Sequence, residues 1–159
     1  NLIVTNCSWG IGLTYEADIV CLGDMYATEI EIKVSKGDLL RDKNKKHTHN
    51  SNLFRYLYFA VPKRLEAVAL KEVPEKSGLL VVEEIDVRTG LHCHKKTDDV
   101  GFYRRQIVMV RPPTYNKNAI KWDMDLRYKL ARLGAIKVLA MKNECFKSKY
   151  VKQEDIIKG

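Results

Sequence analysis

Residues 27–38 of the chain read ATEIEIKVSKGD, and the middle of this stretch decides how the fold is interpreted. Glu29, Glu31 and Lys33 alternate strictly with β-branched residues. Because successive side chains of a β-strand point to opposite faces of the sheet, the three charged residues are expected on one face of a strand over 26–34. The other face is expected to form the core. It carries Ile30, Ile32 and Val34.

The segments around this strand predict a mixed α/β fold. Gly23-Asp24 is a tight-turn signal that joins the strand to a preceding one in a hairpin. Ser35, followed by an acid at Asp38, fits a capping box at the start of a polar helix. Residues 87–104 fit either a long hairpin or a loop. The other strands are expected at 2–5, 13–22, 56–61, 78–85 and 106–110, and the helices at 36–46, 64–71 and 123–141.

Length and composition indicate one soluble globular domain over 1–159, with a basic helical part from about residue 114. No apolar run approaches the roughly 20 residues of a membrane span, so we expect no membrane partner. The four cysteines show no CxxC spacing, which predicts free thiols and a cytoplasmic protein. The first residue is not methionine, as expected of a sequence trimmed at its start.

The net charge of +8 favours a polyanionic partner. Between Lys33 and Arg64 there are nine lysines or arginines and two acids, and between Arg104 and Lys149 there are twelve and three. Such basic segments are typical of phosphate contacts, although solvated helix faces look the same. The expected nucleic-acid-binding residues are Lys36, Arg41, Lys43, Lys45, Lys46, His47, Arg104 and Arg105.

The expected strand over 13–22 carries a second acidic pair. Glu16 and Asp18 share one of its faces, while Tyr15 falls on the other. If the hairpin pairs in a suitable register, Asp18 lies beside Glu31. Two carboxylates, a backbone carbonyl and waters suit Mg²⁺, and a nearby lysine can stabilise charge that develops on a substrate. A hairpin with one solvated face would show the same alternation.

A longer pattern adds a resemblance to a known family. EADIVCLGDMYATEIEIKVSKGDLLRDKNKKH (16–47), YLYFAVP (56–62) and GLLVVEE (78–84) resemble the MmcB-like DNA repair group of the PD-(D/E)XK nuclease superfamily. The resemblance covers residues 13–84. It implies a restriction-endonuclease-like core, with a mixed sheet flanked by helices. It also implies Mg²⁺- or Mn²⁺-dependent hydrolysis of DNA by an endonuclease in repair or processing.

The resemblance also assigns roles to individual residues. Asp18 and Glu31 would be the metal carboxylates, the carbonyl of Ile32 a further ligand, and Lys33 the catalytic lysine. Glu16 matches an acid often found near this site. Asp38 matches an acid after the EIKxS segment, which the capping box explains equally well. Two departures are Ala17 in place of the motif's proline and the absence of a helix before the first strand.

Other interpretations stay open. The chain could be a nucleic-acid-binding module that keeps the fold without catalysis, or a subunit whose basic face docks an acidic protein. A homodimer is also left open, since the sequence gives no oligomeric state. Tyr56 and Tyr58 fit a buried strand better than a base-stacking platform. A zinc site is disfavoured by the lack of finger spacing, although His47, His49, His92, Cys93 and His94 provide ligand types.

Overall fold

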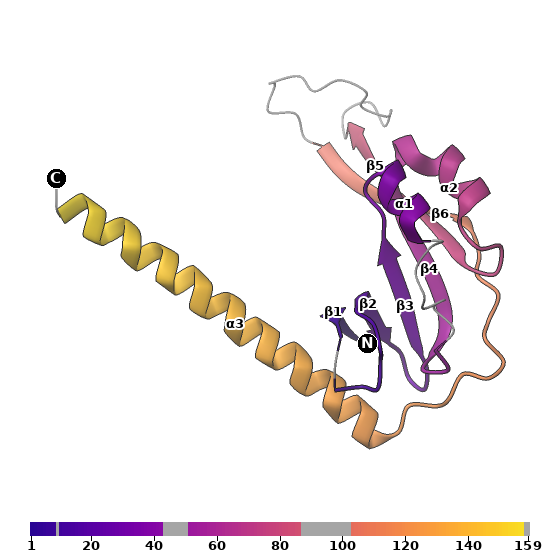
Figure 1. Ribbon diagram of the computed structural model, residues 1–159, viewed down its shortest axis with the longest axis horizontal. Coiled ribbons are helices and arrows are strands. Elements are labelled where there is room, and N and C mark those ends of the chain that lie inside the picture. The colour runs from indigo at the N-terminus through magenta and orange to yellow at the C-terminus, as the bar shows by residue number, and fades with distance from the viewer. Residues whose placement is uncertain (9, 43–50, 87–102, 158–159) are drawn as a thin grey trace.

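The computed structural model of the chain describes residues 1–8, 10–42, 51–86 and 103–157, with side chains over 1–8, 10–41, 51–85 and 104–142 (Figure 1). These described residues form six strands and three α-helices. The strands are β1 (Leu2–Cys7), β2 (Ala17–Leu22), β3 (Ala27–Ile32), β4 (Phe54–Pro62), β5 (Gly78–Asp86) and β6 (Tyr103–Arg111). The helices are α1 (Lys36–Asp42), the short 3₁₀ turn η1 (Lys63–Leu65), α2 (Glu66–Glu72) and α3 (Met124–Ile157).

The six strands form one mixed sheet in the order β1-β2-β3-β4-β5-β6. β3, β4 and β5 are parallel, and the other neighbours pair antiparallel. Parallel neighbours need a crossover, and α1 and α2 supply the two that the sheet requires. The predicted hairpin is confirmed, since the Gly23 N–H donates to the Tyr26 carbonyl at 3.1 Å. β5 pairs antiparallel with β6. Residues 87–102, on which the prediction of a long hairpin or a loop falls, lie outside the described residues.

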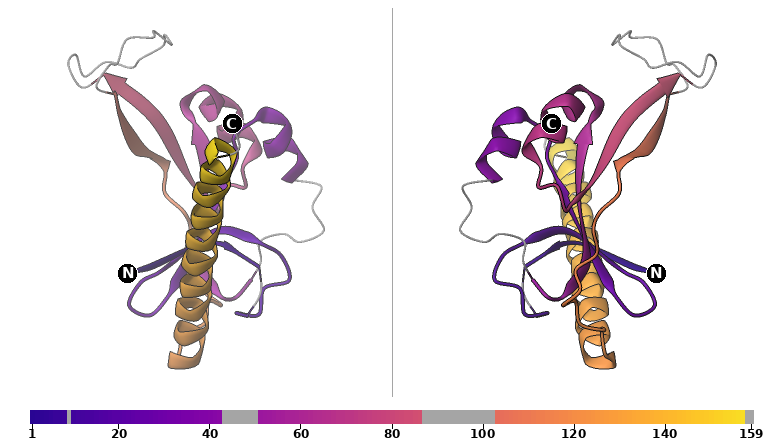
Figure 2. Two further views of the ribbon diagram at one scale, coloured as in Figure 1. Left: turned by 90° about the vertical axis from the view of Figure 1, so that its left-hand side faces the viewer. Right: turned by 90° about the vertical axis from the view of Figure 1, so that its right-hand side faces the viewer.

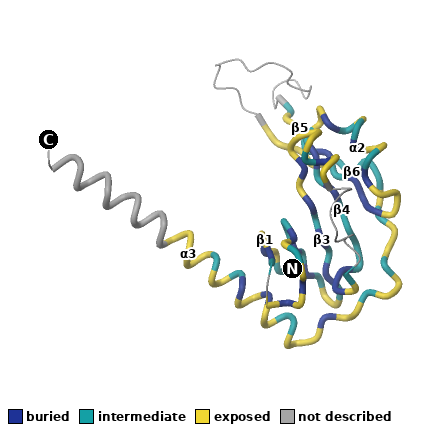
Figure 3. Tube along the Cα trace, in the orientation of Figure 1, coloured by how far each residue is buried: buried dark blue, intermediate teal, exposed yellow. Residues whose placement is uncertain are grey.

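The charged face of β3 is the buried one. Glu29, Glu31 and Lys33 are 0%, 2% and 3% exposed, whereas Ile32 and Val34 are 42% and 60% exposed. The expectation that the β-branched face forms the core was therefore wrong. Figure 3 shows the same pattern along the trace, where buried positions alternate with less buried ones in β3.

The sheet register explains this inversion. Val20 of β2 is the partner of Glu29, and Phe59 of β4 is the partner of Glu31. Directly opposed residues share a face of the sheet, and both apolar partners are at most 1% exposed. The charged row of β3 therefore lies on the face that the helices cover.

Two apolar clusters flank the charged row, and different helices pack on each. In the first cluster α3 packs on β1 and β2, and in the second α1 and α2 pack on β4 and β5. The first includes Val4, Val20, Leu130 and Leu133, and the second includes Leu39, Phe59, Val61 and Ala69. Glu29, Glu31 and Lys33 lie along β3, between the two clusters, because β3 pairs with β2 on one side and with β4 on the other.

α1 begins as the sequence predicted. The Ser35 hydroxyl accepts a hydrogen bond from the Asp38 N–H at 3.1 Å, which is the first half of a capping box. The structure describes α1 as far as Asp42, and the expected continuation to Lys46 lies beyond the described residues.

α3 is longer than predicted and continues through Gly134 to Ile157. A Cβ at Gly134 would lie 3.1 Å from Val4 Cγ2, so the glycine allows the helix to approach β1 closely. Figures 1 and 2 show α3 as a single long helix, and in Figure 1 it extends away from the sheet. None of the helices in the described part of the chain has the length and apolar character that a membrane crossing requires.

Gly78 is expected to be intolerant of a side chain. A Cβ there would lie 2.4 Å from Tyr58 Cδ1 and 3.2 Å from Pro113 Cδ, so Gly78→Ala should lower the free energy of unfolding by about 1–3 kcal/mol. Gly37→Ala is the matched control, because nothing lies within 4 Å of its added Cβ. Urea unfolding followed by circular dichroism measures both. Equal stabilities of the two variants would contradict the tight contact between β4 and β5.

Candidate active site

A buried ion pair lies at the carboxyl end of β3. Lys33 Nζ donates to Glu31 Oε2 at 2.9 Å, and the two side chains are 3% and 2% exposed. The Lys33 N–H donates to the Ala60 carbonyl at 3.0 Å, which extends the pairing with β4 one residue beyond the strand. The Lys33 ammonium also lies 5.9 Å from the centroid of the Phe59 ring. Backbone and ring contacts thus fix the position of the lysine.

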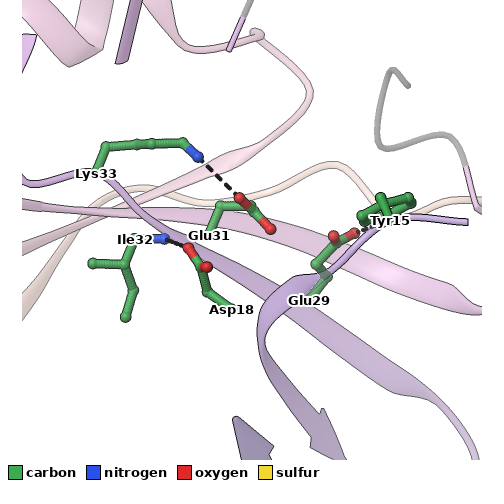
Figure 4. A network of polar contacts seen from close by, with 6 residues as sticks. All are labelled: Tyr15, Asp18, Glu29, Glu31, Ile32 and Lys33. Carbon is green, nitrogen blue, oxygen red and sulfur yellow. Dashed lines mark hydrogen bonds and ion pairs between the residues drawn. The ribbon is translucent and has the colours of Figure 1, made fainter. Parts of the chain in front are cut away.

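Asp18 reaches the same place from the neighbouring strand. Its Oδ2 accepts a hydrogen bond from the Ile32 N–H at 2.7 Å. Ile32 separates Glu31 from Lys33, so the structure brings Asp18 to the backbone between them (Figure 4). Three of the residues that the sequence singled out therefore lie together, while their chemical roles stay a prediction.

Tyr15 and Glu29 extend this cluster in a way that the sequence did not predict. The Tyr15 hydroxyl donates to Glu29 Oε2 at 2.9 Å, and Glu29 is fully buried. Burial raises the pKa of Tyr15 well above its usual range, and the charge of Glu29 raises it further. Because the phenol stays neutral at ordinary pH, it is a hydrogen-bond donor to the carboxylate (Figure 4).

The cluster has the composition of a cation site with oxygen ligands. Three carboxylates and one ammonium give Asp18, Glu29, Glu31 and Lys33 a formal sum of two negative charges. Within the described part of the chain, no three His, Cys, Asp or Glu side chains gather so as to hold a metal by themselves. The expected set instead combines the carboxylates of Asp18 and Glu31 with the Ile32 carbonyl. It suits Mg²⁺, which prefers oxygen ligands and keeps several waters.

Glu16 lies apart from these contacts. It is exposed, and none of the described hydrogen bonds joins it to Asp18 or Glu31. Its charge acts instead on the Cys7 thiol. Burial raises the pKa of that thiol to about 11, Lys137 opposes the rise, and Glu16 adds to it. The structure therefore does not bring Glu16 into the cluster.

Arg64 anchors the segment that follows the ion pair. Its guanidinium Nη2 donates to the Val34 carbonyl at 2.7 Å, which ties η1, the turn after β4, to the residue after Lys33. The sequence analysis included Arg64 only as part of a basic segment. A contact between residues so far apart in the chain leaves no local pattern.

The structure describes only some of the predicted phosphate-contacting residues. Lys36 and Arg41 are exposed at the two ends of α1, and Arg104 and Arg105 are exposed on β6. Arg105 Nε lies 3.4 Å from Glu84 Oε1, so one arginine has an acidic neighbour on β5. The other predicted phosphate contacts, Lys43, Lys45, Lys46 and His47, lie outside the described residues, as do His49, His92, Cys93 and His94 of the disfavoured zinc site.

Comparisons with known proteins concern the fold alone. No protein-family model matches the chain, and neither does any curated protein sequence. Among solved structures, the chain is similar to the SPO1766 protein of unknown function from Silicibacter pomeroyi. The TM-score is 0.53 at 16% sequence identity, and the alignment covers 93% of this chain and 81% of that one. The chain is thus an α/β protein with a six-stranded mixed sheet flanked by helices.

Proposed function

We propose that the chain is a metal-dependent deoxyribonuclease with a restriction-endonuclease-like core. One observation carries the proposal: a buried carboxylate–ammonium pair, Glu31 and Lys33, shares the end of β3 with the Asp18 carboxylate from β2. Buried charges are costly, so a buried ion pair beside a further carboxylate calls for a reason other than stability. The resemblance of residues 13–84 to a nuclease group is the reason for assigning these residues to that chemistry.

The proposed chemistry divides among the residues of the cluster. Asp18, Glu31 and the Ile32 carbonyl would hold Mg²⁺ or Mn²⁺, which when bound activates a water and takes up charge on a phosphoryl oxygen. Lys33 would place its ammonium beside the phosphate and stabilise the charge that develops there. Glu31 holds that ammonium in place through the 2.9 Å contact.

DNA is the proposed partner on the basis of charge. The net charge of +8 and the exposed Lys36, Arg41 and Arg104 supply cations for a phosphate backbone. Lys36 follows Lys33 by three residues, at the first position of α1. A strand of DNA that reaches the end of β3 would therefore meet basic residues beside the proposed site.

The test is a cleavage assay on wild-type protein. Labelled duplex, nicked, branched and single-stranded DNA are incubated with Mg²⁺, with Mn²⁺, or with EDTA. We expect cleavage of at least one substrate with metal, none with EDTA, and recovery when Mg²⁺ is added back in excess. DNA binding without cleavage of any substrate under any of these conditions would contradict the proposal.

A second candidate is a nucleic-acid-binding module without catalysis. The observation that favours it is the burial of Lys33, whose ammonium already has Glu31 as its counter-charge. Such a module would bind DNA with an affinity that falls steeply with salt, because binding releases counterions from the backbone. Its affinity would be the same with metal and with EDTA.

A further inference from the structure

β2 and the segment that leads into it are tied to β3 at two points. Tyr15 bonds the Glu29 carboxylate at 2.9 Å, and three residues later Asp18 bonds the Ile32 N–H at 2.7 Å. On β3, Glu31 lies between these two attachment points. Figure 4 shows the two bonds on either side of the Glu31 side chain. The relative position of Asp18 and Glu31 therefore depends on both bonds.

Glu29 occupies a position where an apolar residue would be expected. Its partner in β2 is Val20, and both are fully buried. A buried carboxylate costs stability unless donors compensate it, so its place in the core calls for a reason other than packing. A third carboxylate beside Asp18 and Glu31 makes the local potential more negative, which favours a divalent cation.

We infer that Tyr15 and Glu29 are positioning residues of the proposed metal site: the Tyr15–Glu29 bond holds Asp18 against Glu31, and the Glu29 charge strengthens cation binding. This inference rests on the proposed function. Neither residue needs to touch the metal or the substrate. Their effect reaches the site through the backbone of residues 15–18 and through the electrostatic potential.

The test measures Mn²⁺ binding directly, by titration calorimetry and by the loss of the free Mn²⁺ signal in electron paramagnetic resonance. Tyr15→Phe removes the hydroxyl and Glu29→Gln removes the charge. Each should raise the dissociation constant for Mn²⁺ about 10–100-fold, which is the usual effect of replacing a residue that orients the ligands of a metal without binding the metal itself. Tyr128→Phe is the matched control, because Tyr128 is 67% exposed on α3 and should leave the constant unchanged.

A second measurement separates positioning from a merely structural role. The Mg²⁺ concentration that gives half-maximal cleavage should rise in both variants by the same factor as the Mn²⁺ constant, while the rate at saturating Mg²⁺ recovers. Lower melting temperatures with an unchanged Mn²⁺ constant would overturn the inference and leave the nuclease proposal intact. Wild-type protein that neither binds Mn²⁺ nor cleaves DNA would overturn both. If Tyr15→Phe fails to fold, Glu29→Gln decides the question alone.

Discussion

Lys33→Met is expected to abolish metal-dependent cleavage and to lower the free energy of unfolding by about 3–5 kcal/mol. The substitution keeps an unbranched side chain over the Phe59 ring but removes the ammonium 2.9 Å from Glu31. Because Glu31 is 2% exposed, water cannot replace that ammonium without structural rearrangement. Urea unfolding measures the stability loss, and the assay on labelled DNA measures cleavage.

A double variant separates the two losses. Glu31→Leu/Lys33→Met replaces the buried pair with apolar side chains of similar volume, which is often neutral or stabilising. We therefore expect the double variant to regain most of the stability that Lys33→Met loses, while cleavage stays absent. Lys129→Met is the matched control. It removes the lysine of an exposed ion pair with Asp125 at 2.6 Å, and we expect no measurable effect.

Two results would contradict these expectations. A double variant that cleaves DNA like the wild type would place the chemistry elsewhere in the molecule. A Lys33→Met variant as stable as the wild type would show that the Glu31 carboxylate tolerates burial without its ammonium.

The local elements of the fold were largely predictable from the sequence. Ser35 begins α1, the Gly23-Asp24 turn joins β2 to β3, and the apolar runs of β4 and β5 lie close to their expected bounds. These signals act over a few residues and depend on turn geometry, capping and strand alternation. They do not depend on which element lies opposite in the folded protein.

The direction in which β3 faces was not predictable in the same way. Alternation shows that Glu29, Glu31 and Lys33 share a face, but it does not show which face is buried. The outcome depends on Phe59 as a partner in β4 and on helices that follow later in the chain. A charged row in a core contradicts the usual hydrophobic pattern, and such conflicts are expected at functional sites.

The Tyr15–Glu29 contact was missed because β2 begins later than predicted. In a strand over 13–22, Tyr15 falls on the face opposite Asp18. In the structure β2 begins at Ala17, so Tyr15 is not bound by that alternation and reaches Glu29. The place of Asp18 beside the end of β3, in contrast, was expected if the hairpin paired in a suitable register, and the observed register of β2 with β3 provides it. Helix α3 shows a similar limit, because it was expected to end at about residue 141 and continues to Ile157, and Gly134 within it lies close to Val4.

Trp122→Ala is expected to lower the free energy of unfolding by about 3–5 kcal/mol, the second large stability effect in this chain. Trp122 is 3% exposed, and its indole N–H donates to the Leu53 carbonyl at 2.7 Å. Its backbone N–H donates to the Met25 carbonyl at 2.8 Å. The segment before α3 is therefore bonded through Trp122 to the residues just before β3 and just before β4. Urea unfolding followed by circular dichroism measures the loss.

Two further variants identify the source of that loss. Trp122→Phe keeps an aromatic ring but not the indole N–H. The Leu53 carbonyl then loses its hydrogen-bond donor, which should lower the free energy of unfolding by about 1–3 kcal/mol. Ile120→Ala, at a position 38% exposed in the same segment, should cost less than either Trp122 variant. If Ile120→Ala proved as costly as Trp122→Ala, apolar side-chain packing along the segment, and not the indole in particular, would hold it in place. If the indole holds this segment in place, Trp122→Ala should also disturb the position of Glu29 in the proposed site. Trp122 and Val20 belong to one apolar cluster, and Val20 pairs with Glu29.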